Sequence, residues 1–265
     1  MKRFYFVAVF ATLALLCGCS KAVDEGKAVE VAKSELSIGL PIGISRTAVD
    51  DEGKASWVEG DTFALWAENT TGQLKLEGAE FQMMYYWHSY QSAVFTSQAN
   101  ALAEGDYTYY MCSPRPTSVD GVKATFNVSA QQSGLYDGKY DIMVAEPTSY
   151  GSITTGERVE LNTIMRHQMH ALKITVPEKA SNFDNKVYAL QITFPTDVVG
   201  DVTLDVANPD AAPTYSNTSN TITVKSDEGF MVGSDIWVFV LPGMVSGDVS
   251  YKITGLEQRS EVATY

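Results

Sequence analysis

Apolar and polar residues alternate along most of this chain of 265 residues. Five short runs place an aliphatic or aromatic residue at every second position: Phe63, Leu65 and Ala67; Leu172, Ile174 and Val176; Leu190, Ile192 and Phe194; Trp237, Phe239 and Leu241; and Val249, Tyr251 and Ile253. Clusters of turn-forming residues (Gly, Asn, Asp or Pro) bound each run. Because helical periodicity is scarce, the pattern predicts an all-β protein built of antiparallel β-sandwiches.

The segment from residue 159 to residue 176 changes its apolar face partway along. In its first part the apolar residues and one histidine occupy odd-numbered positions: Val159, Leu161, Met165, His167 and Met169. In its second part the apolar residues occupy even-numbered positions: Leu172, Ile174 and Val176. A strand changes its buried face only through an extra residue, so we expect a β-bulge or kink near His170 and Ala171. A strand that passes from one sandwich to a second would explain the change. The sequence therefore predicts an N-terminal β-sandwich domain at residues 19–168 and a C-terminal one at 169–265, which need not be complete.

Residues 36–44 form a candidate first strand whose aliphatic side chains share one face: Leu36, Ile38, Leu40, Ile42 and Ile44. Pro41 cannot donate to a central ladder, so we expect an edge strand. Burial of five such side chains contributes roughly 8–15 kcal/mol before the entropy cost, which rivals the net stability of a domain. Without this strand, a long apolar groove could accept an equivalent strand of another chain. The simpler alternative is an ordinary first strand followed by a solvated loop.

The N-terminus has the features of a secretory signal. Lys2 and Arg3 precede an apolar run over residues 4–16, and Leu16-Cys17-Gly18-Cys19 follows. The run is too short to span a bilayer stably. Leu-x-Gly-Cys is similar to the bacterial lipobox, in which the cysteine is acylated and becomes the new N-terminus. We therefore expect a signal peptide at residues 1–18 and a lipid anchor at Cys19; the alternative is an ordinary signal with a chance cysteine.

Charge and cysteine content narrow the classes of partner. The formal net charge of −13 becomes more negative when Lys2 and Arg3 leave with the signal. Phosphate backbones and anionic lipids repel such a surface, so we expect no nucleic-acid partner and membrane contact only through acylated Cys19. Cys112 is then the one cysteine left, which excludes an intrachain disulfide. Its apolar neighbourhood predicts a buried, inert thiol rather than a reactive one.

Residues with catalytic or ligand chemistry are few. The three histidines are His88, His167 and His170, and a straight strand would direct His167 and His170 to opposite faces, a poor metal pair. We expect His167 in a core or a domain interface. The sequence has no Gly-x-Ser-x-Gly, phosphate-binding glycine loop or Cys-x-x-Cys, so no catalytic residue, cofactor or metal ligand is assigned. The carboxylates at residues 50–52 are expected to be solvated, with a Ca²⁺ site as the remoter alternative.

Residues 83–90, Met-Met-Tyr-Tyr-Trp-His-Ser-Tyr, admit two interpretations. They are typical of a strand that supplies core and edge residues. They could also form an aromatic platform for a sugar ring, which would suit a surface glycan-binding lipoprotein that captures polysaccharide.

Four segments together resemble the Bacteroidota fimbrillin family of lipoproteins. They are Ser45-Arg46-Thr47, the run from Trp57 to Trp66, Tyr140 to Ala145, and Val159-x-Leu161 with Met165-x-His167-Gln168-Met169-x-x-Leu172-x-Ile174. Met165 stands where the family pattern more often has an aromatic residue. The resemblance covers about residues 1–200 and implies two tandem transthyretin-like antiparallel β-sandwich domains after a lipoprotein signal.

The resemblance also implies a function and a location. Family members are subunits of type V pili that are exported as lipoproteins, cut after their first strand by an arginine-specific protease, and joined by β-strand exchange. Cys19 matches the acylated cysteine, and Arg46, the one arginine between the signal and Arg115, matches the cleavage site. The polar segment 255–265 differs from a long apolar donor strand, so we expect either that the sequence stops short of the natural C-terminus or that the subunit donates no strand, which would suit a tip, anchor or accessory position. We therefore expect a structural or adhesive protein, not an enzyme, lipid-anchored in the outer membrane or present in a fimbrium, with other pilus subunits and a surface receptor as its partners.

Overall fold

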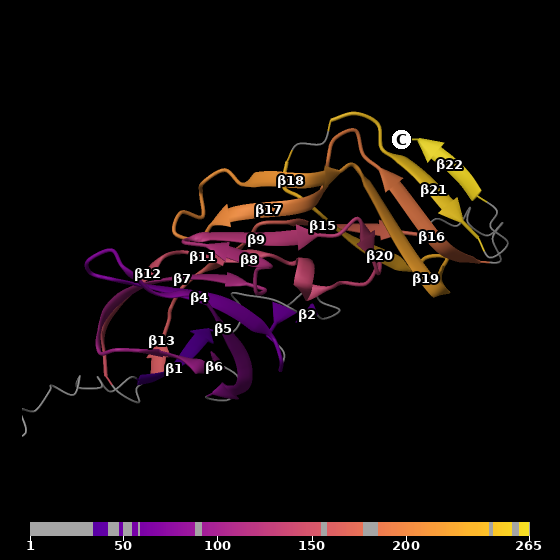
Figure 1. Cartoon of the computed structure of the whole chain (residues 1–265). Helices are drawn as coiled ribbons and strands as arrows, with labels where there is room; N and C mark the ends of the chain where they lie inside the picture. Colours follow the sequence, from indigo (N-terminus) through magenta and orange to yellow (C-terminus); the bar gives the residue numbers. More distant parts are fainter. Residues whose placement is uncertain are drawn as a thin grey trace, which may run out of the picture. The chain divides into compact units, whose positions relative to one another are not determined.

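The five alternating runs lie in or directly beside strands of the computed structural model (Figure 1). This structure describes residues 34–41, 48–49, 55–57, 59–87, 92–154, 158–176, 185–243, 246–255 and 260–264. The one helix among them is the short 3₁₀ turn η1 (Gly138–Tyr140), and no helix in these ranges is long and apolar enough to cross a bilayer. The all-β prediction is therefore confirmed.

The largest sheet contains the first strand. Its order is β13-β1-β6-β5-β4-β7-β11-β14, and β12 also pairs with β7. The strands are β1 (Ser34–Pro41), β4 (Thr62–Asn69), β5 (Leu74–Trp87), β6 (Ser92–Leu102), β7 (Gly105–Ser113), β11 (Met143–Ala145), β12 (Thr148–Ile153), β13 (Arg158–Glu160) and β14 (Met165–His167).

Four smaller sheets contain the other strands of the described residues. Their orders are β10-β19-β16-β21-β22, β18-β17-β9-β8, β15-β20 and β2-β3. Most described pairings are antiparallel, but β1–β13 and β10–β19 are parallel. The strands are β2 (Ala48–Val49), β3 (Ala55–Ser56), β8 (Ser118–Asp120), β9 (Lys123–Val128), β10 (Gln131–Gln132), β15 (His170–Thr175), β16 (Lys186–Thr193), β17 (Val199–Asp205), β18 (Thr214–Ser219), β19 (Thr221–Met231), β20 (Asp235–Val240), β21 (Ser250–Thr254) and β22 (Ser260–Thr264).

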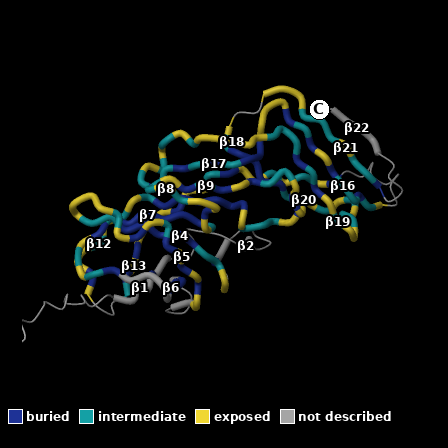
Figure 2. The backbone as a smooth tube through the Cα atoms, in the orientation of Figure 1, coloured by how far each residue is buried: buried dark blue, intermediate teal, exposed yellow. Residues whose placement is uncertain are grey.

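The middle strands of the large sheet are buried on both faces. In β4, Phe63 and Leu65 enter one hydrophobic core with residues of β1, β5 and β6, while Ala64 and Trp66 enter a second core with residues of β9, β16, β17 and β19. β7 and β11 divide their residues between the same two cores. Figure 2 shows these strands as largely buried tubes. The sheet therefore separates two cores, and the apolar run of β4 has no exposed parity.

The chain changes sheets where the sequence predicted a bulge or kink. β14 ends at His167 in the large sheet, and β15 begins at His170 in the β15-β20 sheet. The change of buried parity is thus produced by an interruption between two separate strands, β14 and β15, and not by a bulge within one continuous strand.

The predicted division between residues 168 and 169 falls between these two strands. However, β9 and β10, which precede the division, pair with β17 and β19, which follow it. The two halves of the chain therefore share sheets, and the division into domains 19–168 and 169–265 stays a prediction.

A β-bulge in β5 brings the β8–β9 hairpin onto the large sheet. Leu65 pairs with Ala79 and Ala67 pairs with Leu76, so Glu77 and Gly78 together face Trp66. Gly78 has φ +58°, the left-handed conformation that bulges often require of a glycine.

Two hydrogen bonds hold the hairpin turn in this place. The indole Nε1 of Trp66 donates to the carbonyl oxygen of Gly121 at 2.7 Å, and the backbone N–H of Gly121 donates to Oε1 of Glu77 at 2.8 Å. Val119 of β8 lies against Gly78. The bulge thus aligns both the Trp66 ring and the Glu77 carboxylate with one turn.

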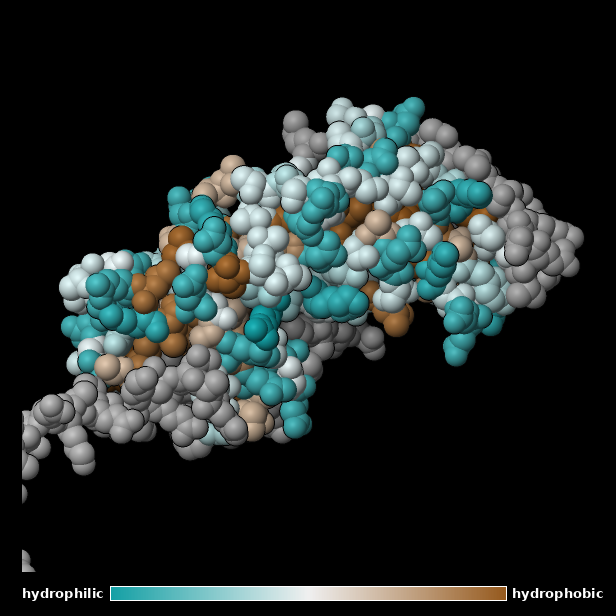
Figure 3. All heavy atoms as spheres, in the orientation of Figure 1, coloured by the Kyte–Doolittle hydropathy of each residue, from teal (hydrophilic) through white to brown (hydrophobic). Residues whose placement is uncertain are grey.

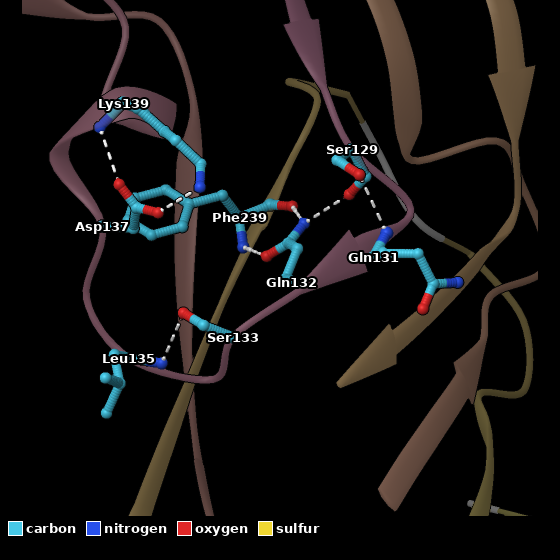
Figure 4. A network of polar contacts seen from close by, with 8 residues as sticks. All are labelled: Ser129, Gln131, Gln132, Ser133, Leu135, Asp137, Lys139 and Phe239. Carbon is cyan, nitrogen blue, oxygen red and sulfur yellow. Dashed lines mark hydrogen bonds and ion pairs between the residues drawn. The ribbon is translucent and has the colours of Figure 1, made fainter. Parts of the chain in front are cut away.

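A buried side chain completes the pairing of β20. Figure 4 shows Gln132 beside Phe239: its Oε1 accepts from the Phe239 backbone N–H and its Nε2 donates to the Phe239 carbonyl oxygen, both at 2.8 Å. Gly134 continues the pattern by accepting from the Trp237 backbone N–H at 2.8 Å. Unpaired buried backbone groups are costly, and the Gln132 amide satisfies both backbone groups of Phe239 as a neighbouring strand would.

We predict that Gly78→Ala destabilises the protein more than Gly121→Ala does. Both glycines have φ near +57°, so both substitutions incur a similar backbone penalty. A Cβ at Gly78 would lie 2.6 Å from Cγ2 of Val119, whereas one at Gly121 would meet nothing within 4 Å. Urea unfolding should therefore give an additional loss of about 1–3 kcal/mol for Gly78→Ala. Equal losses would contradict the proposed packing of the bulge.

Candidate functional site: the position of the first strand

β1 lies between β6 and β13 of the large sheet. We call this position between the two strands the first-strand site. On one side it pairs antiparallel with β6, from Ser34 opposite Leu102 to Pro41 opposite Ser92. On the other side it pairs parallel with β13, where Ile38 is opposite Val159. The expected edge position is therefore wrong.

The position of Pro41 explains why the prediction failed. The pairing with β13 covers only Ser37, Ile38 and Gly39, so it ends before Pro41. The missing N–H of Pro41 therefore cannot weaken the ladder with β13, which does not extend to this residue. The rule about proline therefore applies to this one end of β1 and not to the whole strand.

A row of buried side chains crosses four strands at this site. Val159 of β13 is opposite Ile38 of β1, Ile38 is opposite Phe95 of β6, and Phe95 is opposite Met83 of β5. Val159, Ile38 and Phe95 are 0% exposed and Met83 is 2% exposed. Because directly opposed residues on one face of a sheet pack against each other, Ile38 links the two sides of this row.

Aromatic rings form the base of the row. The ring of Phe95 meets Trp57 edge to face at 4.8 Å between centroids and meets Phe63 in the same manner at 4.7 Å. Phe63 also stacks on Phe81 at 5.4 Å. These arrangements are the ones that aromatic pairs favour. The first-strand site thus contains an apolar surface that Ile38 covers.

The sequence predictions about this strand are met only in part. Burial is confirmed for Ile38. Ile42 and Ile44, the acidic segment 50–52, Cys19 and Arg46 all lie outside the described residues. Acylation of Cys19 and cleavage after Arg46 therefore stay predictions.

His167 is not a core residue, because its side chain is 41% exposed. Its Nδ1 lies 2.6 Å from Oδ1 of Asp141, a carboxylate that is 6% exposed. The hydroxyl of Tyr136 donates to the other Asp141 oxygen at 2.6 Å. Buried Asp141, which the sequence did not single out, is thus held by His167 of β14 and by Tyr136 beside η1. Within the described ranges, no group of three or more His, Cys, Asp or Glu residues is arranged for a metal ion.

Burial raises the pKa of two side chains of β7, Cys112 and Tyr110. Cys112 is a free, fully buried thiol, and burial raises its pKa. The predicted burial is therefore confirmed, and the inert character of the thiol, which desolvation of the thiolate favours, stays a prediction. On the same strand, burial and then the hydrogen bond to Glu68 raise the pKa of Tyr110 to about 12.

The aromatic run 83–90 contributes to the core and to the surface. Met83 is in the core, whereas Met84 and Tyr85 are 52% and 48% exposed. Both are exposed because a register shift in β5 lies between Met83 and Tyr85. Figure 3 shows one face of the molecule, where hydrophobic residues reach the surface between hydrophilic ones. The side chains of residues 86–90 lie outside the description, so an aromatic platform stays a prediction.

We predict that Ile38→Ala lowers the free energy of unfolding by about 2–5 kcal/mol, since it leaves a cavity in a fully buried row. Ile38→Val should cost only about 0.5–1.5 kcal/mol. The control is Met84→Ala, whose exposed side chain should change stability by at most about 0.5 kcal/mol. Equal effects of Ile38→Ala and Met84→Ala in urea unfolding would refute the burial of the first strand.

Comparisons with known proteins identify the fold. No protein-family model and no curated protein matches the sequence. A candidate cell adhesion protein from Bacteroides uniformis matches with a TM-score of 0.59 and 15% identity, over 87% of this chain and 83% of that one. Similar candidates from Bacteroides ovatus (TM-score 0.55, 12% identity, 88% and 86% covered) and Bacteroides fragilis (TM-score 0.52, 13% identity, 87% of each chain covered) also match. The chain therefore has the fold of these Bacteroides proteins, and the predicted resemblance holds at the level of the fold.

Proposed function

We propose that this chain is an exported surface lipoprotein that acts as a structural or adhesive subunit of a fimbrium. Its support is the fold that it shares with candidate cell adhesion proteins, together with the lipobox ending at Cys19 and Arg46 after the first strand. The single observation that carries the proposal is the fold shared with the candidate cell adhesion protein of Bacteroides uniformis. The two-sided pairing of β1 argues against the release of an edge strand that the sequence predicted.

The inner position of β1 changes the assembly mechanism that the sequence predicted. An edge strand would leave one open edge when it departs, but departure of β1 would leave the facing edges of β6 and β13 unpaired. It would also uncover Phe95 and Val159. An incoming strand would be fixed by hydrogen bonds on both sides and by a residue at the level of Ile38. Strand exchange in this proposal is therefore a replacement within the sheet.

The remaining parts of the proposal come from the sequence resemblance. They are a pair of transthyretin-like domains at residues 19–168 and 169–265, a lipid anchor in the outer membrane, and the place of a tip, anchor or accessory subunit. Cleavage after Arg46 would separate Cys19 from the rest of the chain and favour assembly into a pilus, whereas a mature chain that keeps acylated Cys19 would favour an anchor or another surface lipoprotein.

A glycan-binding surface lipoprotein is the second candidate function. The adjacent exposed side chains of Met84 and Tyr85 favour it, because apolar surface that faces solvent can receive the apolar face of a sugar. Titration with polysaccharides would separate the candidates, with Tyr85→Ala as the variant that should lose binding at this place.

We predict that trimming with an arginine-specific protease gives a new N-terminus at Thr47. Mass spectrometry of the trimmed chain is the measurement. Arg46→Lys should abolish this product, and Arg166→Lys, which changes an arginine of β14, should not. Resistance of Arg46 to the protease, with cleavage elsewhere, would count against the pilus proposal and leave the lipoprotein proposal standing.

We predict that Cys19→Ser releases the chain from the membrane fraction. The acylated peptide that begins at Cys19 should disappear from the mass spectrum, because serine offers no thiol for the acyl group. Cys17→Ser serves as the control, since residue 17 would leave with the signal peptide. Membrane attachment that survives Cys19→Ser would exclude the proposed anchor.

A further inference from the structure

A pocket of about 320 Å³ lies on elements that take no part in the first-strand site. It is lined by Pro114, Arg115 and Thr117 from the β7–β8 connection, Phe126 and Asn127 from β9, and Lys139 and Tyr140 from η1. This volume is at the small end of the range for ligand pockets, about 300–1,000 Å³. The pocket can thus take a ligand of one or two rings.

Two cations line this pocket, on a chain with a formal net charge of −13. Asp137 holds Lys139 twice: it accepts from the Lys139 backbone N–H at 3.1 Å and contacts its ammonium at 2.6 Å (Figure 4). The ammonium also lies 4.7 Å from the centroid of the Tyr140 ring. The hydrogen bond with Asp137 raises the pKa of Lys139, so this side chain is a fixed positive charge.

Arg115 is the second cation, and Glu80 contacts its Nη1. A guanidinium group carries five N–H donors, so this contact leaves donors for a ligand. The planar fork of arginine matches carboxylate and phosphate groups, and a carboxylate brings less negative charge to this acidic chain. The half-exposed side chains of Arg115 and Lys139 also remain open to a ligand, because they are 58% and 62% exposed.

The other lining residues suit a sugar ring. Phe126 and Tyr140 are only 3% and 6% exposed, so they form a largely buried floor and, with partly exposed Pro114, give the pocket a small apolar surface against which one ring can lie. Asn127 uses its Nδ2 on Asp201 at 2.7 Å, which leaves its Oδ1 to accept from a hydroxyl group. A plain fatty acid would use neither this acceptor nor the compact shape of the pocket.

We propose that this pocket binds a single carboxylate-bearing sugar residue, with its carboxylate at Arg115 and Lys139 and a hydroxyl at Asn127. The acidic surface of the chain disfavours a polyanion, so one carboxylate per recognised unit is the expected ligand. The inference gives a ligand class to the proposed adhesive function and depends on that function only for its biological purpose. It requires neither acylation of Cys19 nor cleavage after Arg46.

The test is a ligand-observed NMR titration of the purified whole chain with glucuronate and with N-acetylneuraminate. Glucose and acetate are the controls that lack the carboxylate or the ring. We expect binding of at least one acidic sugar, at least about 10-fold weaker binding of glucose and acetate, and weaker binding at high salt. Equal binding of glucose and glucuronate, or binding of neither acidic sugar, would overturn the proposal.

Matched variants locate the binding. Lys139→Met and Arg115→Ala should each weaken glucuronate binding about 10-fold or more. Lys123→Met and Arg166→Ala are the controls, and both should leave glucuronate binding unchanged because these cations lie outside the pocket lining. Their exposure is similar, and both are ion-paired: Lys123 to Asp205, and Arg166 to Glu146 and Asp210.

The outcomes also separate this inference from the other proposals. Loss of binding in Tyr85→Ala, with binding kept in the pocket variants, would move the sugar to β5 and refute the pocket. Normal cleavage after Arg46 together with absent sugar binding would overturn the pocket and leave the fimbrial proposal intact.

Discussion

The burial of β4, β7 and β11 on both faces is the constraint on which the rest of the structure depends. In a strand, successive side chains point to opposite sides, so Phe63 and Leu65 serve one core while Ala64 and Trp66 serve the other. Neither core is complete without these strands. The first-strand site, which belongs to one core, is therefore built on the same backbone that supports the second core.

Polar contacts fix how the second core meets this sheet. The bulge at Gly78 lets the hairpin turn at Gly121 receive the Trp66 indole, and the Gln132 side chain satisfies the backbone of Phe239. In both places a buried polar group would otherwise lack a partner, which costs more than an ordinary hydrogen bond contributes. These contacts therefore select one arrangement among the many that apolar packing alone would allow.

Local patterns in the sequence were sufficient to predict where strands form, but not which strands lie beside one another. The alternation of Phe63 with Leu65 predicts one buried face correctly, but nothing local indicates that Ala64 and Trp66 are buried too, because their partners lie in distant strands. The inner place of β1 was missed for the same reason, since β13 is only three residues long and far away in sequence. Pro41 correctly indicates that its own backbone lacks a hydrogen-bond donor, but it led to the wrong prediction that the whole strand lies at an edge.

The candidate sites show the same limit. Cys112 was predicted correctly, because an apolar neighbourhood is a local property. The partner of His167 was not, because Asp141 comes from a segment that only the fold brings beside β14. Arg115, Asn127 and Lys139 carry no shared motif and become a pocket only through the three-dimensional arrangement.

The unequal pairing on the two sides of β1 suggests how the strand could leave. Its ladder with β13 covers Ser37, Ile38 and Gly39, whereas its ladder with β6 extends from Ser34 to Pro41. Separation from β13 breaks fewer hydrogen bonds and would come first, while β6 still holds the strand. An incoming strand could then pair with the freed edge of β13 before Ile38 gives up its place against Phe95. Such stepwise replacement avoids a state in which the whole apolar row faces water, and that exposure is the largest cost that strand exchange at this site must overcome.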